Sequence, residues 1–196
     1  MKIVCIGHAA YDITIPLDEY PIENSKTRVD NRVECGGGPA ATAAYLLGKW
    51  GSDVTFLGVV GNDEYGKHIK KELDSVNVDT TFLELNDEYE TTSSFIIANQ
   101  SKGSRTILTY RQSDMKMSHV DLTFKPDLIL LDGQEYKMTL DLLEKYPNAI
   151  SIMDAGRKTE EIVTLAKKVN YLVTSKNFAE EVTGIEIDYE DSDTLK

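Results

Sequence analysis

Residues 36–44 have the sequence Gly-Gly-Gly-Pro-Ala-Ala-Thr-Ala-Ala, and this stretch decides how the chain is organised. Glycine permits a positive φ and lets a ligand or another segment approach the backbone. Proline suits the first turn of a helix, and alanine extends a helix at the lowest cost. The pattern predicts a loop that opens a helix whose first N–H groups could hold substrate oxygens. A tight turn before a closely packed helix explains the same residues equally well, so both interpretations stay open.

The sequence on both sides of this loop predicts an α/β sheet. Lys2–Gly7 and Asp53–Val60 are apolar runs typical of buried strands. One helix is expected over Pro39–Lys49. A second helix is expected to run to about Ser75, with Asn62 or Asp63 as its N-cap. Strands and helices then alternate, with strands expected at 127–132, 150–154 and 171–174 and helices at 137–145, 159–168 and 176–183. Such alternation implies parallel strands joined by right-handed crossovers.

Other extended segments do not fit this winding. Residues 13–20 and 28–35 alternate loosely and are interrupted by Pro16, Pro21 and Asn24. Residues 92–99 and 105–110 are rich in β-branched and aromatic side chains and predict a hairpin. We expect the segments at about 13–35 and 92–110 to form a small lid over the ligand edge of the sheet, within one domain of residues 1–196.

Composition excludes several classes of function. The chain has 196 residues and a net charge of −12, which disfavours nucleic-acid binding. It has no apolar run long enough to span a membrane. Cys5 and Cys35 lack metal-ligand spacing, and the N-terminus does not resemble a signal peptide, so a reducing cytoplasm is expected. Cys5 and Trp50 are expected to be buried in the core.

Asp12 is the first candidate for a binding residue. It follows the strand at Lys2–Gly7, and ligands of open α/β sheets bind beyond the carboxyl ends of the strands. Its carboxylate could accept hydrogen bonds from substrate hydroxyls. An Asx-turn in a loop is the equally weighted alternative.

Four motifs carry a family resemblance. They are Ile6-Gly7 followed by Asp12, the segment from Gly37-Gly38 through Thr42 to Trp50-Gly51, the segment Gly58-Val59-Val60-Gly61-Asn62-Asp63-Glu64-Tyr65-Gly66, and Asn177-Phe178-Ala179-Glu180. In this order the motifs resemble those of the ribokinase-like (PfkB) carbohydrate kinases over essentially the whole chain. The resemblance implies a three-layer α/β sandwich with a mostly parallel sheet and a small β-strand lid.

The resemblance also implies an activity, which is transfer of the γ-phosphoryl group of ATP, with Mg²⁺, to a hydroxymethyl group of a sugar or sugar derivative. Asp12 would then bind sugar hydroxyls, and Gly37 and Gly38 would let the sugar approach backbone N–H groups. Thr42 stands where the family has an asparagine, so it offers one hydroxyl in place of an amide. Gln134 is a further candidate for substrate binding, although an exposed loop glutamine is as good an explanation.

Asn177 and Glu180 match the motif that helps to hold Mg²⁺ in this family, through water. The same spacing at the start of a helix is also typical of a capping box, in which the asparagine caps the helix and the glutamate bonds back. Spacing alone does not separate these two roles.

The Gly-Ala-Gly-Asp motif that carries the family's catalytic base does not occur in this sequence, and neither does its threonine-glycine ATP-binding stretch. Because phosphoryl transfer depends on positioned charges around the phosphates, we expect an incomplete, N-terminal portion of a kinase that is inactive alone. A non-catalytic sugar-binding or regulatory module is the alternative. A nicotinamide-dependent dehydrogenase is disfavoured, since Gly7 is not followed by the expected glycines. A homodimer formed through the lid is a further expectation.

Overall fold

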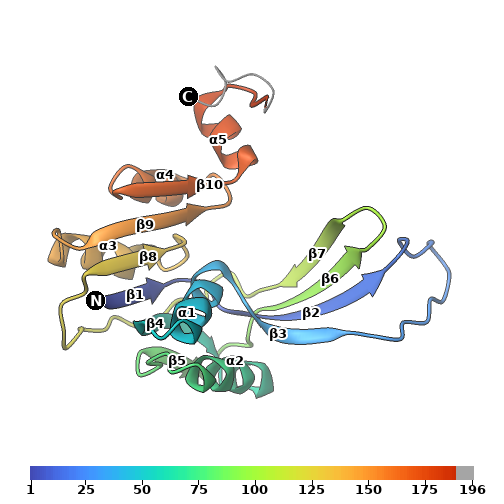
Figure 1. The fold of residues 1–196 in the computed structure, drawn as a ribbon, viewed down its shortest axis with the longest axis horizontal. Helices are drawn as coiled ribbons and strands as arrows, with labels where there is room; N and C mark the ends of the chain where they lie inside the picture. The colour runs from blue at the N-terminus through green and yellow to red at the C-terminus, as the bar shows by residue number, and fades with distance from the viewer. Residues whose placement is uncertain (189–196) are drawn as a thin grey trace.

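The computed structural model describes residues 1–188 of the chain. A six-stranded sheet has the order β10-β9-β8-β1-β4-β5, and every neighbouring pair is parallel (Figure 1). Its strands are β1 (Lys2–Ile6), β4 (Asp53–Gly61), β5 (Leu83–Asn86), β8 (Leu128–Leu131), β9 (Ile150–Ala155) and β10 (Tyr171–Thr174). The parallel α/β sheet expected from the sequence is confirmed.

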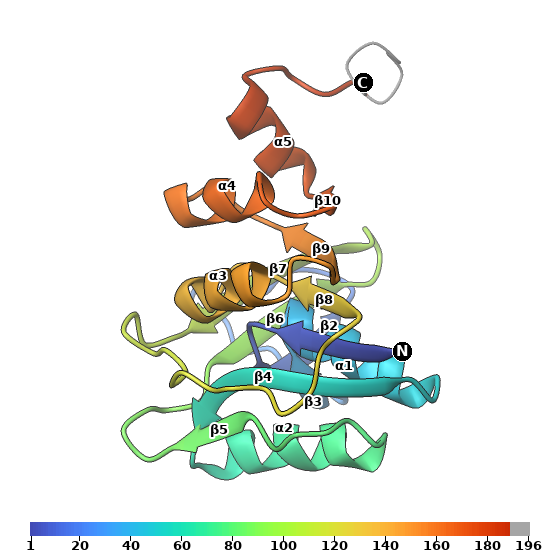
Figure 2. The same ribbon diagram turned by 90° about the vertical axis from the view of Figure 1, so that its left-hand side faces the viewer.

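Helices cover both faces of this sheet. The covering helices are α1 (Pro39–Lys49), α2 (Glu64–Ser75), α3 (Tyr136–Lys145) and α4 (Glu160–Ala166), and α5 (Lys176–Thr183) lies beyond the edge strand β10 (Figure 1). Figure 2 shows α3 and α4 on one side of the sheet and α1 on the other. The molecule therefore has three layers, as the sequence predicts.

The side chains of β1 show how these layers are held together. Ile3 and Cys5 pack into a core with residues of α1 and α2, whereas Val4 and Ile6 pack into a second core with α3 and α4. All four are almost fully buried, because successive strand residues point to opposite faces of a covered sheet. Burial of each such aliphatic side chain contributes about 1.5–3 kcal/mol. The free thiol of Cys5 is buried, which confirms the expectation from the sequence, and this burial raises its pKa to about 12.

A second, four-stranded sheet projects from one end of this body (Figure 1). It has the order β3-β2-β6-β7, with strands β2 (Ala10–Leu17), β3 (Val33–Gly37), β6 (Ser93–Asn99) and β7 (Ser104–Tyr110). β6 and β7 form the antiparallel hairpin expected from the sequence, while β2 pairs with β6 in parallel. We call this small mixed sheet the lid sheet.

Two expectations need correction. Residues 18–32 lie between β2 and β3 and form no strand, so the strand expected over 28–35 begins only at Val33. Pro21 and the positive φ of Asn24 (61°) are incompatible with a ladder in the first half of this segment, between the end of β2 and about residue 24. Trp50 is not a core residue, since 71% of it is exposed. It is the C-cap of α1, beyond the last turn that packs on the sheet, and Gly51 then reverses the chain.

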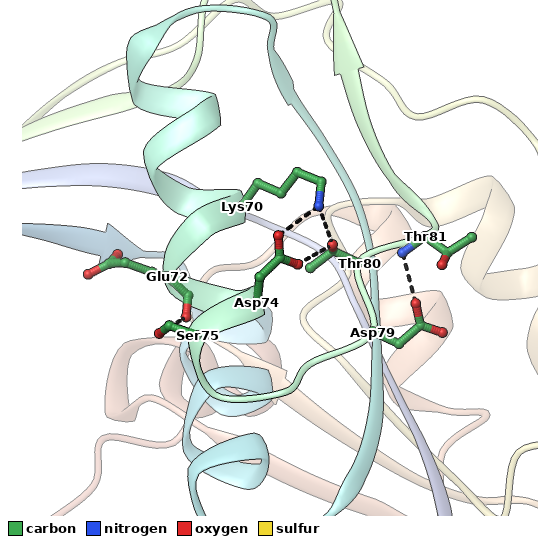
Figure 3. A network of polar contacts seen from close by, with 7 residues as sticks. All are labelled: Lys70, Glu72, Asp74, Ser75, Asp79, Thr80 and Thr81. Atoms are coloured by element: carbon green, nitrogen blue, oxygen red, sulfur yellow. Dashed lines mark hydrogen bonds and ion pairs between the residues drawn. The ribbon is translucent and has the colours of Figure 1, made fainter.

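Polar contacts join both ends of α2 to neighbouring segments. At its start Asp63 caps the helix through the Gly66 N–H (2.8 Å) and also accepts the N–H of Thr91, just before β6 (2.8 Å). At its end the Thr80 hydroxyl donates to Asp74 (2.6 Å), and Lys70 bonds to both residues (Figure 3). These contacts fix the lid sheet and the approach to β5 against one helix. Asp63 as the N-cap is one of the two residues proposed for that role from the sequence.

Within residues 1–188, none of the helices combines the length and the apolar character needed to cross a membrane.

Candidate functional site

The glycine loop joins the lid sheet to α1. Gly38 is the N-cap of α1 with a φ of 94°, and a Cβ there would overlap the carbonyl group of His8, so only glycine fits without strain. The N–H groups of Ala40 and Ala41 donate to Asp132 Oδ2 (3.2 Å) and to the carbonyl oxygen of His8 (3.3 Å). The open N–H groups predicted at the start of this helix are therefore not found at these two residues.

Asp12 lies directly beside this loop. It is on β2, and a Cβ added to Gly37 of the neighbouring β3 would overlap its carboxylate. Burial raises the pKa of Asp12, and a hydrogen bond from Ser94 opposes that shift only in part. The structure thus brings together two of the residues proposed for sugar binding, a carboxylate and a glycine backbone.

The face of the lid sheet that carries Asp12 is polar along the row of residues that pair with Asp12 across the strands. Asp12 pairs with Ser94 of β6, and Ser94 pairs with Thr109 of β7, with 3.4 Å between their hydroxyl oxygens. The opposite face belongs to Tyr11, whose ring stacks on Tyr65 of α2 at 4.3 Å. Because strand neighbours alternate, the row from Asp12 to Thr109 points away from α2.

Thr109 also lines a cavity of about 390 Å³ at the carboxyl ends of β1, β8 and β9. Figure 1 shows these three strands ending on the side from which the lid sheet projects. The cavity is lined by His8, Pro39, Thr109, Arg111, Asp132, Gln134, Asp154, Gly156, Arg157 and Ile162. Its position is the one at which open α/β sheets bind ligands.

Asp132 is the acidic centre of this cavity. Its carboxylate accepts the N–H groups of His8 (2.8 Å), Gln134 (3.0 Å) and Ala40 (3.2 Å), which join β1, β8 and α1. Burial raises its pKa against the effect of these bonds. Sequence reasoning counted Asp132 only as the end of a strand, although the position that singled out Asp12 applies to it as well.

Two cationic side chains line the same cavity. Arg111 follows β7 of the lid sheet, and Arg157 follows β9. Burial together with these two arginines lowers the pKa of His8 to about 4, so His8 is neutral near neutral pH. The buried Glu135 accepts the N–H of Met117 (3.1 Å), and burial raises its pKa. The sequence did not predict that these residues line one cavity, because they lie far apart along the chain.

The other proposed substrate residues lie in different surroundings. Gln134 lines the 390 Å³ cavity, whereas Thr42 lines a hollow of about 210 Å³ with Gly36 and Glu72, between α1, α2 and β3. A larger hollow of about 800 Å³ lies at the amino ends of β8 and β9, lined by residues 122–127 and 145–150. It contains none of the residues proposed for binding, and ligands of such sheets bind at the other ends of the strands.

Asn177 and Glu180 lie in the first two turns of α5, one helical turn apart. The N-cap of this helix is Ser175, which accepts the Phe178 N–H (3.1 Å), so the capping box built on Asn177 is wrong. Glu180 accepts the N–H of Ile187 (2.8 Å) and lies 3.5 Å from the Lys176 ammonium group. Residues 1–188 contain no cluster of three or more His, Cys, Asp or Glu side chains suited to a metal ion. The pair therefore fits only a Mg²⁺ ion that keeps most of its water or phosphate ligands.

Comparison with known proteins gives the family. The model of the pfkB family carbohydrate kinases matches residues 1–195. A nucleoside kinase of Methanocaldococcus jannaschii is 21% identical over 100% of this chain and 66% of its own length. A ketohexokinase of Mus musculus is 28% identical over 74% of this chain and 50% of its own length.

Solved structures show the same fold. A putative ribokinase from Agrobacterium tumefaciens superposes with a TM-score of 0.81 at 23% identity, over 99% of this chain and 64% of that protein. The ribokinase of Arabidopsis thaliana complexed with ribose and ATP superposes with a TM-score of 0.73 at 18% identity, over 99% of this chain and 67% of that protein. The chain thus spans about two thirds of the length of these proteins. It belongs to the pfkB family of carbohydrate kinases.

Proposed function

We propose that this chain binds the acceptor of an ATP-dependent kinase that phosphorylates a hydroxymethyl group of a sugar or sugar derivative. One observation carries the proposal. Asp12 lies against Gly37 on a lid-sheet face whose polar row leads through Ser94 to the cavity at the strand ends. A carboxylate beside a bare backbone suits a polyol, because it accepts hydrogen bonds from hydroxyls while the glycine leaves them room.

Each proposed residue has a distinct task in binding. Asp12 would orient the acceptor by accepting bonds from its hydroxyls, and Gly37 and Gly38 would let the sugar ring lie on the backbone. Gln134 would contact the substrate from the cavity floor. Thr42 is the least supported of the set, because it lines a separate hollow. The lid sheet would cover the acceptor and exclude water during transfer.

ATP and Mg²⁺ are the co-substrate and cofactor of the proposed reaction. Mg²⁺ would neutralise phosphate charge, and Asn177 and Glu180 on α5 would help to hold it through water. The sequence has no Gly-Ala-Gly-Asp motif to supply a catalytic base. We therefore propose that these 196 residues alone bind the acceptor but do not transfer phosphate at a useful rate. The same observation keeps a non-catalytic sugar-binding module as the second candidate.

Calorimetric titration with a panel of neutral and anionic sugars tests the proposal. At least one sugar should bind, and Asp12→Asn should weaken that binding about tenfold or more, since a bond to a charged acceptor is lost. Asp18→Asn is the matched control, because Asp18 is exposed just beyond β2 and should leave binding unchanged. A panel in which no sugar binds would refute acceptor binding. Phosphate transfer by the chain alone would refute its inactivity.

A homodimer through the lid sheet is part of the proposal. Support comes from apolar side chains that are 46–60% exposed on β6 and β7, which are Phe95, Ile107, Leu108 and Tyr110. Sedimentation should show a dimer that Leu108→Lys dissociates. A dimer that persists in this variant would place the contact elsewhere.

A further inference from the structure

Two guanidinium groups line the 390 Å³ cavity without an ion-pair partner. They belong to Arg111 and Arg157. Among residues 1–188, neither guanidinium group forms an ion pair, that is, neither has a carboxylate oxygen within 4.0 Å. The two cations repel each other, and partial burial of Arg111 adds to the cost of holding its charge there. An anion between them would remove this repulsion and replace lost water contacts.

The carboxylates of the cavity do not already serve as that anion. Asp132 is bound by three backbone N–H groups, and these hold it at the floor formed by β1, β8 and α1. Glu135 is buried and bound to the Met117 N–H. The carboxylates of Asp132 and Glu135 both attract Arg111 from a distance. Asp154, the third acidic residue, is exposed and forms no ion pair with either arginine within residues 1–188. The donor fork of each arginine is therefore available to a ligand.

The position of Arg111 indicates which ligand this is. It follows Thr109 by two residues, so it continues the face of the lid sheet that carries Asp12 and Ser94. Arg157, which follows β9, lines the same cavity, and the pKa of Arg111 is lowered by burial and also by the charge of Arg157. The residues proposed for Mg²⁺ lie farther along the sheet, on α5 after the edge strand β10. A group held by Arg111 is thus on the acceptor side.

We propose that Arg111 and Arg157 form an anion subsite that selects an acceptor with a carboxylate or phosphate substituent, an inference that rests on the proposed sugar-kinase function. A guanidinium matches both groups with two parallel N–H bonds. The substrate class is then a sugar acid or a sugar phosphate. Neutral sugars bind through Asp12 and the glycines alone and bind more weakly.

Three titrations of the 196-residue chain test this proposal. Inorganic phosphate alone, followed by NMR of the arginine side-chain N–H signals, should shift the signals of Arg111 and Arg157. The pairs ribose with ribose 5-phosphate, and glucose with gluconate, should show by calorimetry that the anionic member binds about tenfold or more tightly. The two pairs also show whether phosphate or carboxylate is preferred. ATP titrated without acceptor reports binding of nucleotide phosphate.

Arg111→Gln and Arg157→Gln should each remove the phosphate response and the preference for the anionic sugar, while neutral sugars bind within about twofold of wild type. Arg105→Gln is the matched control, since this exposed arginine lies near the start of β7, the strand that Arg111 follows, and does not line the cavity. An unchanged phosphate response in both variants would overturn the subsite. Variants that weaken only ATP would overturn its assignment to the acceptor. Phosphate binding without binding of any sugar would refute the proposed function and the acceptor assignment, but not the subsite.

Discussion

Asp12 combines a proposed binding role with a cost to stability that its raised pKa predicts. Burial raises the pKa of its carboxyl group, and no cation among residues 1–188 compensates for that shift. The folded chain therefore binds the Asp12 proton more tightly than the unfolded chain does. It follows that this residue lowers stability as the pH rises through its folded-state pKa.

Asp12→Asn removes this titration while keeping an acceptor for Ser94. At neutral pH the variant should melt at a higher temperature than wild type, although it binds sugar more weakly. Well below the unfolded-state pKa of about 3.9 the two melting temperatures should converge, because wild-type Asp12 is then protonated in both states. Melting curves of both proteins across this pH range measure the effect. A variant that is less stable at neutral pH would show that Asp12 has a structural role.

Single residues also show what the sequence could and could not predict. Asp12 was proposed because it follows an apolar strand, and the structure places it against Gly37. Arg111 and Arg157 were missed, since they meet only when β7 of the lid sheet is brought over the end of β9. Trp50 was misplaced because large aromatic side chains are usually buried, and the sequence does not show that this one lies outside the packed turns of α1.

At the scale of elements, apolar runs predicted the strands of the parallel sheet well, because both of its faces are covered. The lid strands were less well predicted, since their faces are partly exposed and their ends depend on pairing. β2 begins at Ala10, earlier than expected, because it pairs there with Gly37 of the glycine loop. Local sequence carries no signal for that long-range contact.

The junction of α2 with β5 offers a test at this scale. Thr80→Val should lower the free energy of unfolding by about 1–2 kcal/mol, because the buried hydroxyl joins Asp74 and Lys70 (Figure 3). Ser75→Ala is the control, since its exposed hydroxyl only donates to the Glu72 carbonyl oxygen, and it should cost less than about 0.5 kcal/mol. Urea unfolding measures both. Equal effects of the two variants would contradict a stabilising role for the network.

At the scale of the whole molecule, the sheet ends in an exposed strand. β10 pairs with β9 on one side, and Tyr171, Leu172 and Val173 are 61%, 43% and 60% exposed. An apolar edge strand offers unpaired backbone groups to other chains. We expect the 196-residue chain to form, in addition to the lid-sheet dimer, larger assemblies through this edge.

Val173→Lys should reduce this association, because a lysine on an edge strand disfavours pairing with a second strand. Light scattering at increasing protein concentration measures it for both proteins. Lys167→Glu, an exchange of charge outside the strand, is the control. Equal scattering from Val173→Lys and wild type would show that association uses another surface.

The central claim is that a polyol binds between Asp12, the glycine loop and the carboxyl ends of the parallel strands. A crystal structure of the chain soaked with the tightest-binding sugar of the panel tests it most directly. The account predicts sugar hydroxyls within hydrogen-bond distance of the Asp12 carboxylate, with the ring over Gly37 and Gly38. A sugar found instead in the hollow at the amino ends of β8 and β9, with Asp12 uncontacted, would contradict it.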